Sequence, residues 1–89
     1  MNNLPEGWEL ISGSIENIPV KFNKMYPDGT DVIIEIKYSN NLYEVWSSAE
    51  HRVSGPNENM EGQFDNVENA MAASINEMIG WDDYLEKLI

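Results

Sequence analysis

The side chains that could carry out catalysis are few and lack the neighbours that catalysis requires. His51 is the only histidine, and adjacency to Glu50 and Arg52 implies no positioned partner for a general base. The serines lack the glycine-flanked turn of a hydrolase nucleophile, and no glycine-rich phosphate loop or dinucleotide fingerprint occurs. We therefore expect a protein that is not an enzyme and needs no organic cofactor.

Metal binding has little support from the spacing of possible ligands. Asp82 with Asp83, or the stretch 57–59 with Glu61, could in principle hold a hard cation. Neither follows the alternating order of an EF-hand loop, and the absence of cysteine excludes thiolate zinc sites and disulfides. The sequence thus predicts no metal site and a fold stabilised by packing alone.

Length and composition set the scale of the fold. The 89 residues form one small domain, residues 1–89, since several cores need a longer chain. The first residues show neither a basic segment nor a long apolar segment, so we expect a cytoplasmic protein that does not enter membranes. The net charge of −11 would repel phosphate backbones and anionic lipid heads, which argues against direct binding of nucleic acids.

The clearest local pattern is a β-hairpin centred on Asn40 and Asn41. Polar and apolar residues alternate in 32–38 and again in 42–47, and asparagine tolerates the positive φ of a type I′ turn. This register pairs Tyr38 with Tyr43, Lys37 with Glu44, Ile36 with Val45, and Glu35 with Trp46. The apolar sets then share one face of the sheet, and Trp46 lies on the other.

Two further hairpins extend this pattern toward the N-terminus. A three-residue loop within Tyr26–Thr30 pairs Phe22 with Ile34, Val20 with Ile36, Ile18 with Tyr38, and Lys21 with Glu35. A turn at Glu16–Asn17 pairs Ile15 with Ile18, Ile11 with Phe22, and Glu9 with Lys24, with Gly13 as a candidate bulge. The sequence thus predicts four strands in a meander.

The C-terminal part is predicted to be helical after a long irregular segment. Residues 50–64 are polar and contain Gly55, Pro56 and Gly62, so we expect a loop. Asp65 and Glu68 then form a capping-box-like start to a helix that Gly80 ends. Residues 81–89 form a short second helix, with Trp81, Tyr84, Leu85 and Leu88 packing back onto the core.

The predicted fold class is therefore α+β. A four-stranded antiparallel meander has one face covered by the helix 65–79 and the short terminal helix. The apolar helix positions, spaced for one face, are Val67, Ala70, Met71, Ser74, Ile75 and Met78. The core residues they would meet are Ile18, Val20, Phe22, Ile34, Ile36 and Val45.

Negative charge gathers in the second half of the chain. Residues 53–86 contain no Lys or Arg, whereas the predicted strand pairs Glu9–Lys24, Lys21–Glu35 and Lys37–Glu44 neutralise much of the first half. The unbalanced carboxylates are those of Glu58, Glu61, Asp65, Glu68, Glu77, Asp82, Asp83 and Glu86. They would raise the encounter rate with a basic surface, or they would serve only solubility.

Trp46 is a second candidate for partner binding. It is predicted to share the uncovered sheet face with Ile33, Leu42 and either Trp8 or Leu10, and exposed tryptophan is a common interface anchor. Alternatively, the N-terminal segment or the loop 50–64 folds over it.

These observations favour a binding module. In size and charge the chain resembles phage-encoded inhibitors that occupy the nucleic-acid sites of host enzymes. The leading hypothesis is an acidic inhibitor that engages a basic, nucleic-acid-binding partner protein by charge mimicry, through the eight carboxylates and Trp46. The alternatives are a small subunit or homodimer joined through the face around Trp46, and a small-ligand-binding protein with the loop 50–64 as a lid.

Overall fold

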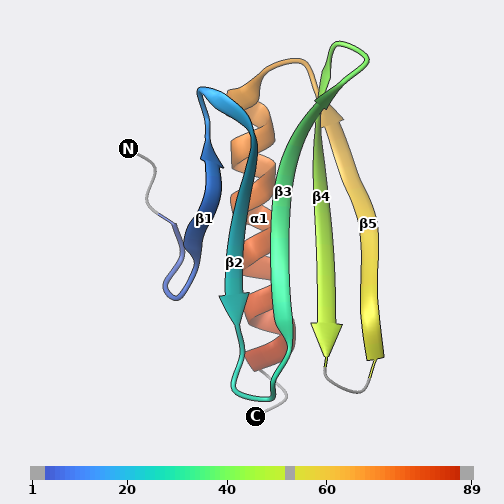
Figure 1. Cartoon of the computed structure of the whole chain (residues 1–89). Helices are drawn as coiled ribbons and strands as arrows, with labels where there is room; N and C mark the ends of the chain where they lie inside the picture. The colour runs from blue at the N-terminus through green and yellow to red at the C-terminus, as the bar shows by residue number, and fades with distance from the viewer. Residues whose placement is uncertain (1–3, 52–53, 87–89) are drawn as a thin grey trace.

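The protein is a five-stranded antiparallel sheet with one helix packed on one face. The computed structural model describes residues 4–51 and 54–86. The strands follow one another in the order β1-β2-β3-β4-β5, and Figure 1 shows α1 behind the sheet. The elements are β1 (Glu9–Ser14), β2 (Asn17–Met25), β3 (Asp31–Ser39), β4 (Leu42–His51), β5 (Ser54–Phe64) and α1 (Val67–Glu86). The α+β class is confirmed, but the described residues form five strands rather than four and one helix rather than two.

The central hairpins have the predicted registers. Ile36 pairs with Val45 and Glu35 pairs with Trp46, and both residues of the β3–β4 turn, Asn40 and Asn41, have positive φ. The β2–β3 register is also as predicted, with Val20 opposite Ile36, Lys21 opposite Glu35, and Phe22 opposite Ile34. Alternation on both sides of a short turn determines these registers, because a shift by one residue would turn the apolar side chains to the other face.

The predicted register of β1 is wrong by one residue at Glu9 and Leu10, whereas Ser12 lies opposite Lys21 as that register requires. Leu10, not Ile11, lies opposite Phe22, and Glu9 lies opposite Asn23 instead of Lys24. The pairing is irregular on both sides of Ser12, next to Gly13, whose φ is +72°. A Cβ at Gly13 would lie 2.0 Å from the carbonyl oxygen of Pro19, so the backbones approach closely there, and the irregularity predicted at Gly13 is confirmed.

The segment predicted as a loop is largely strand β5. It pairs with β4 from Tyr43–Phe64 to His51–Ser54 despite its polar sequence. β5 is the last strand of the sheet, and its described side chains from Asn57 onward are mostly exposed. The alternation that marks buried strands is therefore absent, and backbone pairing with β4 forms the strand. A lid made from this segment is not compatible with the structure.

Helix α1 starts later and ends later than predicted. The side chain of Asn66, not Asp65, accepts a hydrogen bond from the Asn69 backbone N–H at 2.8 Å and caps the helix. Gly80 does not end the helix but lies within it. The helix continues because Leu85 is buried beyond Gly80, and because Asp82 has partners on the sheet. Leu88 lies outside the described residues.

The core lies between the sheet and α1. The buried strand residues are Val20, Phe22, Val32, Ile34, Ile36 and Val45, and the buried helix residues are Ala70, Met71, Ser74, Met78 and Leu85. Most predicted core positions are thus confirmed, whereas Ile18, Val67 and Ile75 are only partly buried. Trp8 and Tyr26 add to this core, so Trp8 is not on the uncovered face where it was a candidate.

Replacing Gly80 with Ala tests whether the helix is continuous. Apart from the neighbouring residues and the surrounding helix backbone, no atom lies within 4 Å of the position that a Cβ would occupy at Gly80, and Ala favours a helix interior by about 1 kcal/mol over Gly. We expect Gly80→Ala to stabilise the fold by about 0.5–1 kcal/mol in urea unfolding. Gly13→Ala is the control, and it should be strongly destabilising. A loss of stability in Gly80→Ala would contradict a continuous helix.

Candidate functional site

The eight predicted carboxylates do not form one row. Asp82 and Glu86 turn toward β2, Glu61 and Glu77 meet between β5 and α1, and Glu58 lies on the opposite face of the sheet. Asp65, Glu68 and Asp83 are exposed near the start of α1 and along it. The chain thus has an internally paired acidic site, an unpaired acidic groove and scattered surface charges.

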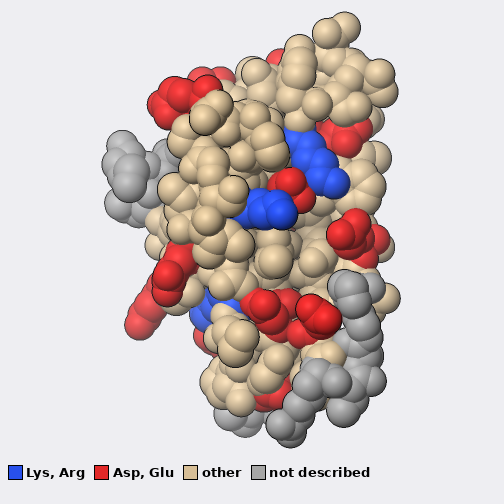
Figure 2. All heavy atoms as spheres, in the orientation of Figure 1, with Lys and Arg blue, Asp and Glu red and all other residues tan. Residues whose placement is uncertain are grey.

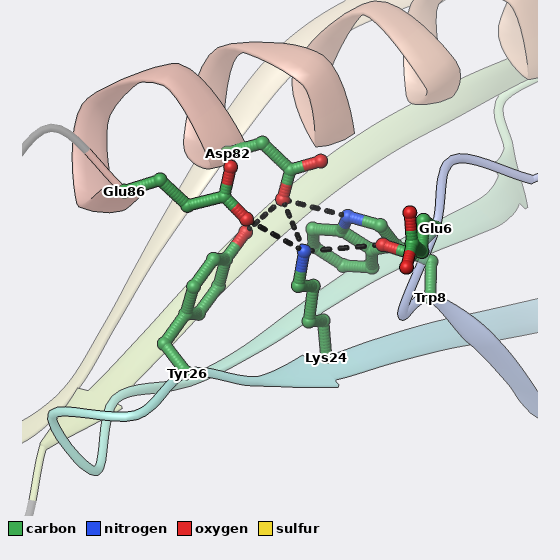
Figure 3. A network of polar contacts seen from close by, with 6 residues as sticks. All are labelled: Glu6, Trp8, Lys24, Tyr26, Asp82 and Glu86. Atoms are coloured by element: carbon green, nitrogen blue, oxygen red, sulfur yellow. Dashed lines mark hydrogen bonds and ion pairs between the residues drawn. The ribbon is translucent and has the colours of Figure 1, made fainter.

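Asp82 is the centre of a polar network beneath the last turns of α1. Its Oδ1 accepts hydrogen bonds from Lys24 Nζ at 2.9 Å, Tyr26 Oη at 2.7 Å and Trp8 Nε1 at 3.2 Å (Figure 3). Lys24 Nζ also lies 3.2 Å from Glu86 Oε2 and donates to the carbonyl oxygen of Glu6 at 3.1 Å. The network therefore ties the N-terminal segment and β2 to the end of α1.

Burial strengthens the electrostatic interactions of this network. The Lys24 and Asp82 side chains are only 13% and 18% exposed, so little water screens their ion pair. Burial alone would lower the pKa of Lys24, but hydrogen bonds and charges from Asp82 and Glu86 outweigh it and raise that pKa. Burial and the same carboxylates raise the pKa of Tyr26. Asp82 and Glu86, which were both predicted to bind a partner, are thus engaged by Lys24 of the protein itself. Lys24 had been predicted to pair with Glu9.

An open groove separates β5 from the second half of α1. This β5–α1 groove has a volume of about 400 Å³ and is lined by Glu61, Glu77, Gly80, Trp81 and Tyr84. Within the β4–β5 pairing, Met60 lies opposite Trp46 and Gly62 opposite Val45, which leaves Glu61 as the extra residue of a bulge. Its carboxylate accepts a hydrogen bond from the buried Ser47 hydroxyl, and this contact holds it on the helix side.

The groove combines negative charge with aromatic surface. Burial, and then the charge of Glu61, raise the pKa of Glu77, so the two carboxylates repel each other. The rings of Trp81 and Tyr84 meet edge to face with centroids 6.2 Å apart, and Tyr84 is 63% exposed rather than packed into the core as predicted. Among residues 4–51 and 54–86, no Lys forms an ion pair with either glutamate. The groove is thus suited to a cation from outside.

Sequence reasoning missed this groove because it ended the helix at Gly80. Glu77, Trp81 and Tyr84 are spaced i, i+4 and i+7, which places them along one helix face when the helix continues. The spacing was present in the sequence, whereas the position of Glu61 beside it depended on β5.

The sheet face turned away from α1, called the open face below, holds Trp46 in a charged setting. Lys37 Nζ lies 4.5 Å from the Trp46 ring centroid, and Trp46 Nε1 donates to Glu44 Oε1 at 3.0 Å. A hollow of about 80 Å³ there is lined by Lys21, Ile33, Glu35, Lys37, Trp46, Ser47, Ser48 and Glu58. Figure 2 shows lysine atoms in the middle of this face with carboxylates close by. Trp46 is on the predicted face, half-buried by its own polar neighbours.

The remaining candidate chemistry is sparse. His51 Nε2 lies 3.0 Å from the carbonyl oxygen of Asp28, at the β2–β3 turn. Within the described ranges, no group of three or more potential metal ligands lies together, because strand alternation separates Glu58 from Glu61. The described part of the chain also holds no helix with the length and apolar character that crossing a membrane demands.

A second groove lies between α1 and the β1–β2 hairpin. It has a volume of about 310 Å³, and its lining is mostly apolar: Leu4, Leu10, Ser14, Ile15, Glu16, Val20, Phe22 and Met71. Leu10 is 51% exposed there, on the α1 side rather than on the open face where it was a candidate. The groove offers apolar contact but few polar groups to orient a ligand.

Comparisons with known proteins found no family model, no curated protein and no solved structure that matches this chain. Function must therefore be argued from the geometry alone.

Removing Asp82 should destabilise the fold strongly. Asp82→Ala leaves Lys24, Tyr26 and Trp8 without their shared acceptor, and we expect a loss of about 2–4 kcal/mol in urea unfolding at neutral pH. Glu86→Ala is the matched control. Its carboxylate is 57% exposed, so the loss should stay below about 1 kcal/mol.

The same variant should change the response to alkali. The pKa values of Lys24 and Tyr26 are raised in the fold from 10.5 and 10.0, so their contribution to stability is complete below about pH 10. It is lost as pH rises through the folded values, because the unfolded chain releases these protons first. Asp82→Ala should show a shallower alkaline loss, and equal slopes would contradict the assignment.

Neutralising Glu77 should stabilise the protein at neutral pH. Its pKa is raised in the fold from 4.5, so stability falls as pH rises from that value through the folded pKa. We expect Glu77→Gln to gain up to about 1 kcal/mol at neutral pH and little at about pH 4, where the wild-type carboxyl is largely protonated. Thermal unfolding at both pH values measures this. Glu68→Gln is the control, and a gain independent of pH would count against repulsion in the groove.

Proposed function

We propose that this protein is a non-enzymatic binding module that engages a basic surface of a partner protein through its β5–α1 side. The observation that carries the proposal is the β5–α1 groove, in which Glu61 and Glu77 lie beside exposed aromatic surface without a cation from the described residues. Such a group of charges is unfavourable in the free protein and becomes favourable when a basic partner supplies the missing cation.

The surrounding charge extends this acidic surface. Glu58, Asp65, Glu68 and Asp83 also form no ion pair with any lysine that the structure describes. Asp82 and Glu86 contribute less, since Lys24 already pairs with them. We therefore assign partner binding chiefly to Glu61 and Glu77, with the other unpaired carboxylates steering the encounter.

The partner that best fits this chemistry is a nucleic-acid-binding protein. Proteins that bind nucleic acids present Lys and Arg at positions suited to phosphate groups, and carboxylates can occupy the same positions. The protein would then act as an inhibitor by charge mimicry. Its own net charge of −11 disfavours direct contact with nucleic acid.

The contacts on the open face do not favour the alternative function, a homodimer joined through Trp46. Lys37 and Glu44 already contact Trp46, so the face presents charged groups where an apolar interface would need an uncovered ring. Sedimentation of the wild type and of Trp46→Ala tests the homodimer alternative. We expect both proteins to be monomeric, and this result would exclude a homodimer joined through Trp46.

Affinity capture tests the proposal. Immobilised wild-type protein is exposed to nuclease-treated lysate of the source organism at low salt and eluted with a salt gradient. We expect a basic protein that is released by rising salt and whose own nucleic acid competes for binding. The variant carrying Glu61→Gln and Glu77→Gln should lose it, whereas the control carrying Glu9→Gln and Glu16→Gln, with the same net charge, should retain it.

Two results would contradict the proposal. Capture that does not depend on salt concentration would argue against a basic surface on the partner. Equal loss of capture in the groove variant and in the control variant would show that net charge alone, and not the groove, determines binding.

A further inference from the structure

The outer edge of β5 is open to another strand. β5 is the last strand of the sheet, so among the residues that the structure describes no strand pairs with the N–H and C=O groups along its outer edge. It spans 11 residues, and its stretch Asn57–Met60 pairs with β4 without interruption. The opposite edge, β1, spans 6 residues and is interrupted twice. β5 is therefore the better template for strand addition.

The β5–α1 groove lies on the helix side of this last strand. Glu61 belongs to β5 itself, and the other lining residues belong to α1. In an added strand, successive side chains point to opposite faces of the sheet. Every second side chain of a strand paired with β5 would therefore point toward the helix side, where the groove opens.

We propose that an extended segment of a basic partner protein adds to the outer edge of β5 and places a Lys or Arg side chain in the β5–α1 groove. This inference rests on the proposed function and adds its structural mode. Backbone hydrogen bonds would supply sequence-independent affinity, and the groove would select the cation.

The groove offers both kinds of contact that a cationic side chain uses. The carboxylates of Glu61 and Glu77 provide charge-assisted acceptors, and a cation between them also relieves their mutual repulsion. The rings of Trp81 and Tyr84 provide aromatic surface for cation–π contact and for the methylene groups of the side chain. Apolar or acidic side chains could not form these charge-assisted contacts with Glu61 and Glu77.

A second copy of this chain fits the edge poorly. Pairing two β5 strands would bring Glu58 and Glu61 of both copies near one another, and like charges on adjacent strands are destabilising. Each copy carries a net charge of −11, which adds long-range repulsion.

Two synthetic peptides test strand addition. One alternates Lys and Val and can form a strand, whereas the other alternates Lys and Pro at equal length and charge but has far fewer backbone donors and resists sheet pairing. Binding is followed by calorimetry, and amide hydrogen exchange of the labelled protein locates it. We expect the Lys-Val peptide to bind more tightly and to slow exchange at amides of β5.

Variants then test the groove. Glu61→Gln with Glu77→Gln keeps acceptor oxygens and should weaken the Lys-Val peptide by about tenfold or more, equivalent to about 1.4 kcal/mol. The charge-matched control, Glu9→Gln with Glu16→Gln, should change affinity by less than about twofold. Equal weakening in both variants would overturn the role of the groove.

The outcomes separate this inference from the function on which it rests. Equal affinity for both peptides, or no binding at millimolar concentration, overturns strand addition, while the capture experiment with folded proteins decides the basic-partner proposal independently. Slow exchange along β5 in a dimer of the protein alone would also overturn the inference, because a second copy would then occupy the edge.

Discussion

The fold depends on burying one apolar sheet face against a single helix. The chain has no cysteine, so no disulfide restricts the unfolded state, and packing must offset the entropy of folding. Ile34, Ile36 and Val45 supply the sheet side of this contact and are fully buried, and Met78 supplies the helix side. Because α1 runs on past Gly80, the same interface extends to Leu85. Every feature at the end of the helix therefore depends on that continuation.

Continuation of the helix also decides where positive charge lies. Asp82 and Glu86 reach Lys24 only because they follow Gly80 on the same helix, and together they engage the lysine that was predicted to pair with Glu9. Lys37 is occupied similarly, with its ammonium over Trp46 and 4.0 Å from Glu35. The stability of the fold is thus linked to the binding that we propose, because lysines engaged in the fold are not available to neutralise the β5–α1 groove.

Sequence patterns predicted the parts of the fold in which side-chain burial determines the backbone. Alternation around Asn40 and Asn41 specified the central register, and helical spacing specified most buried positions of α1. The sequence did not predict strand β5, because β5 is held by backbone hydrogen bonds to β4 and its mostly exposed side chains show no alternation of polar and apolar residues. The helix end was misplaced because Gly80 resembles a C-cap, and the tertiary contacts of Asp82 and Leu85 outweigh the helix propensity of one glycine. Both errors fell at the groove, so its residues could be predicted only in part.

The charges along β5 have two physical consequences that act together. An open strand edge exposes a protein to self-association, and carboxylates near the edge oppose it, since every copy presents the same sign. Glu58 on the open face and Glu61 on the helix side protect both faces of this edge. Under our proposal, the charge that opposes a second copy would attract a cationic strand. In the binding mode that we propose, protection from aggregation and selection of a basic partner arise from the same residues, and an edge that needed only protection would gain nothing from the aromatic surface of Trp81 and Tyr84.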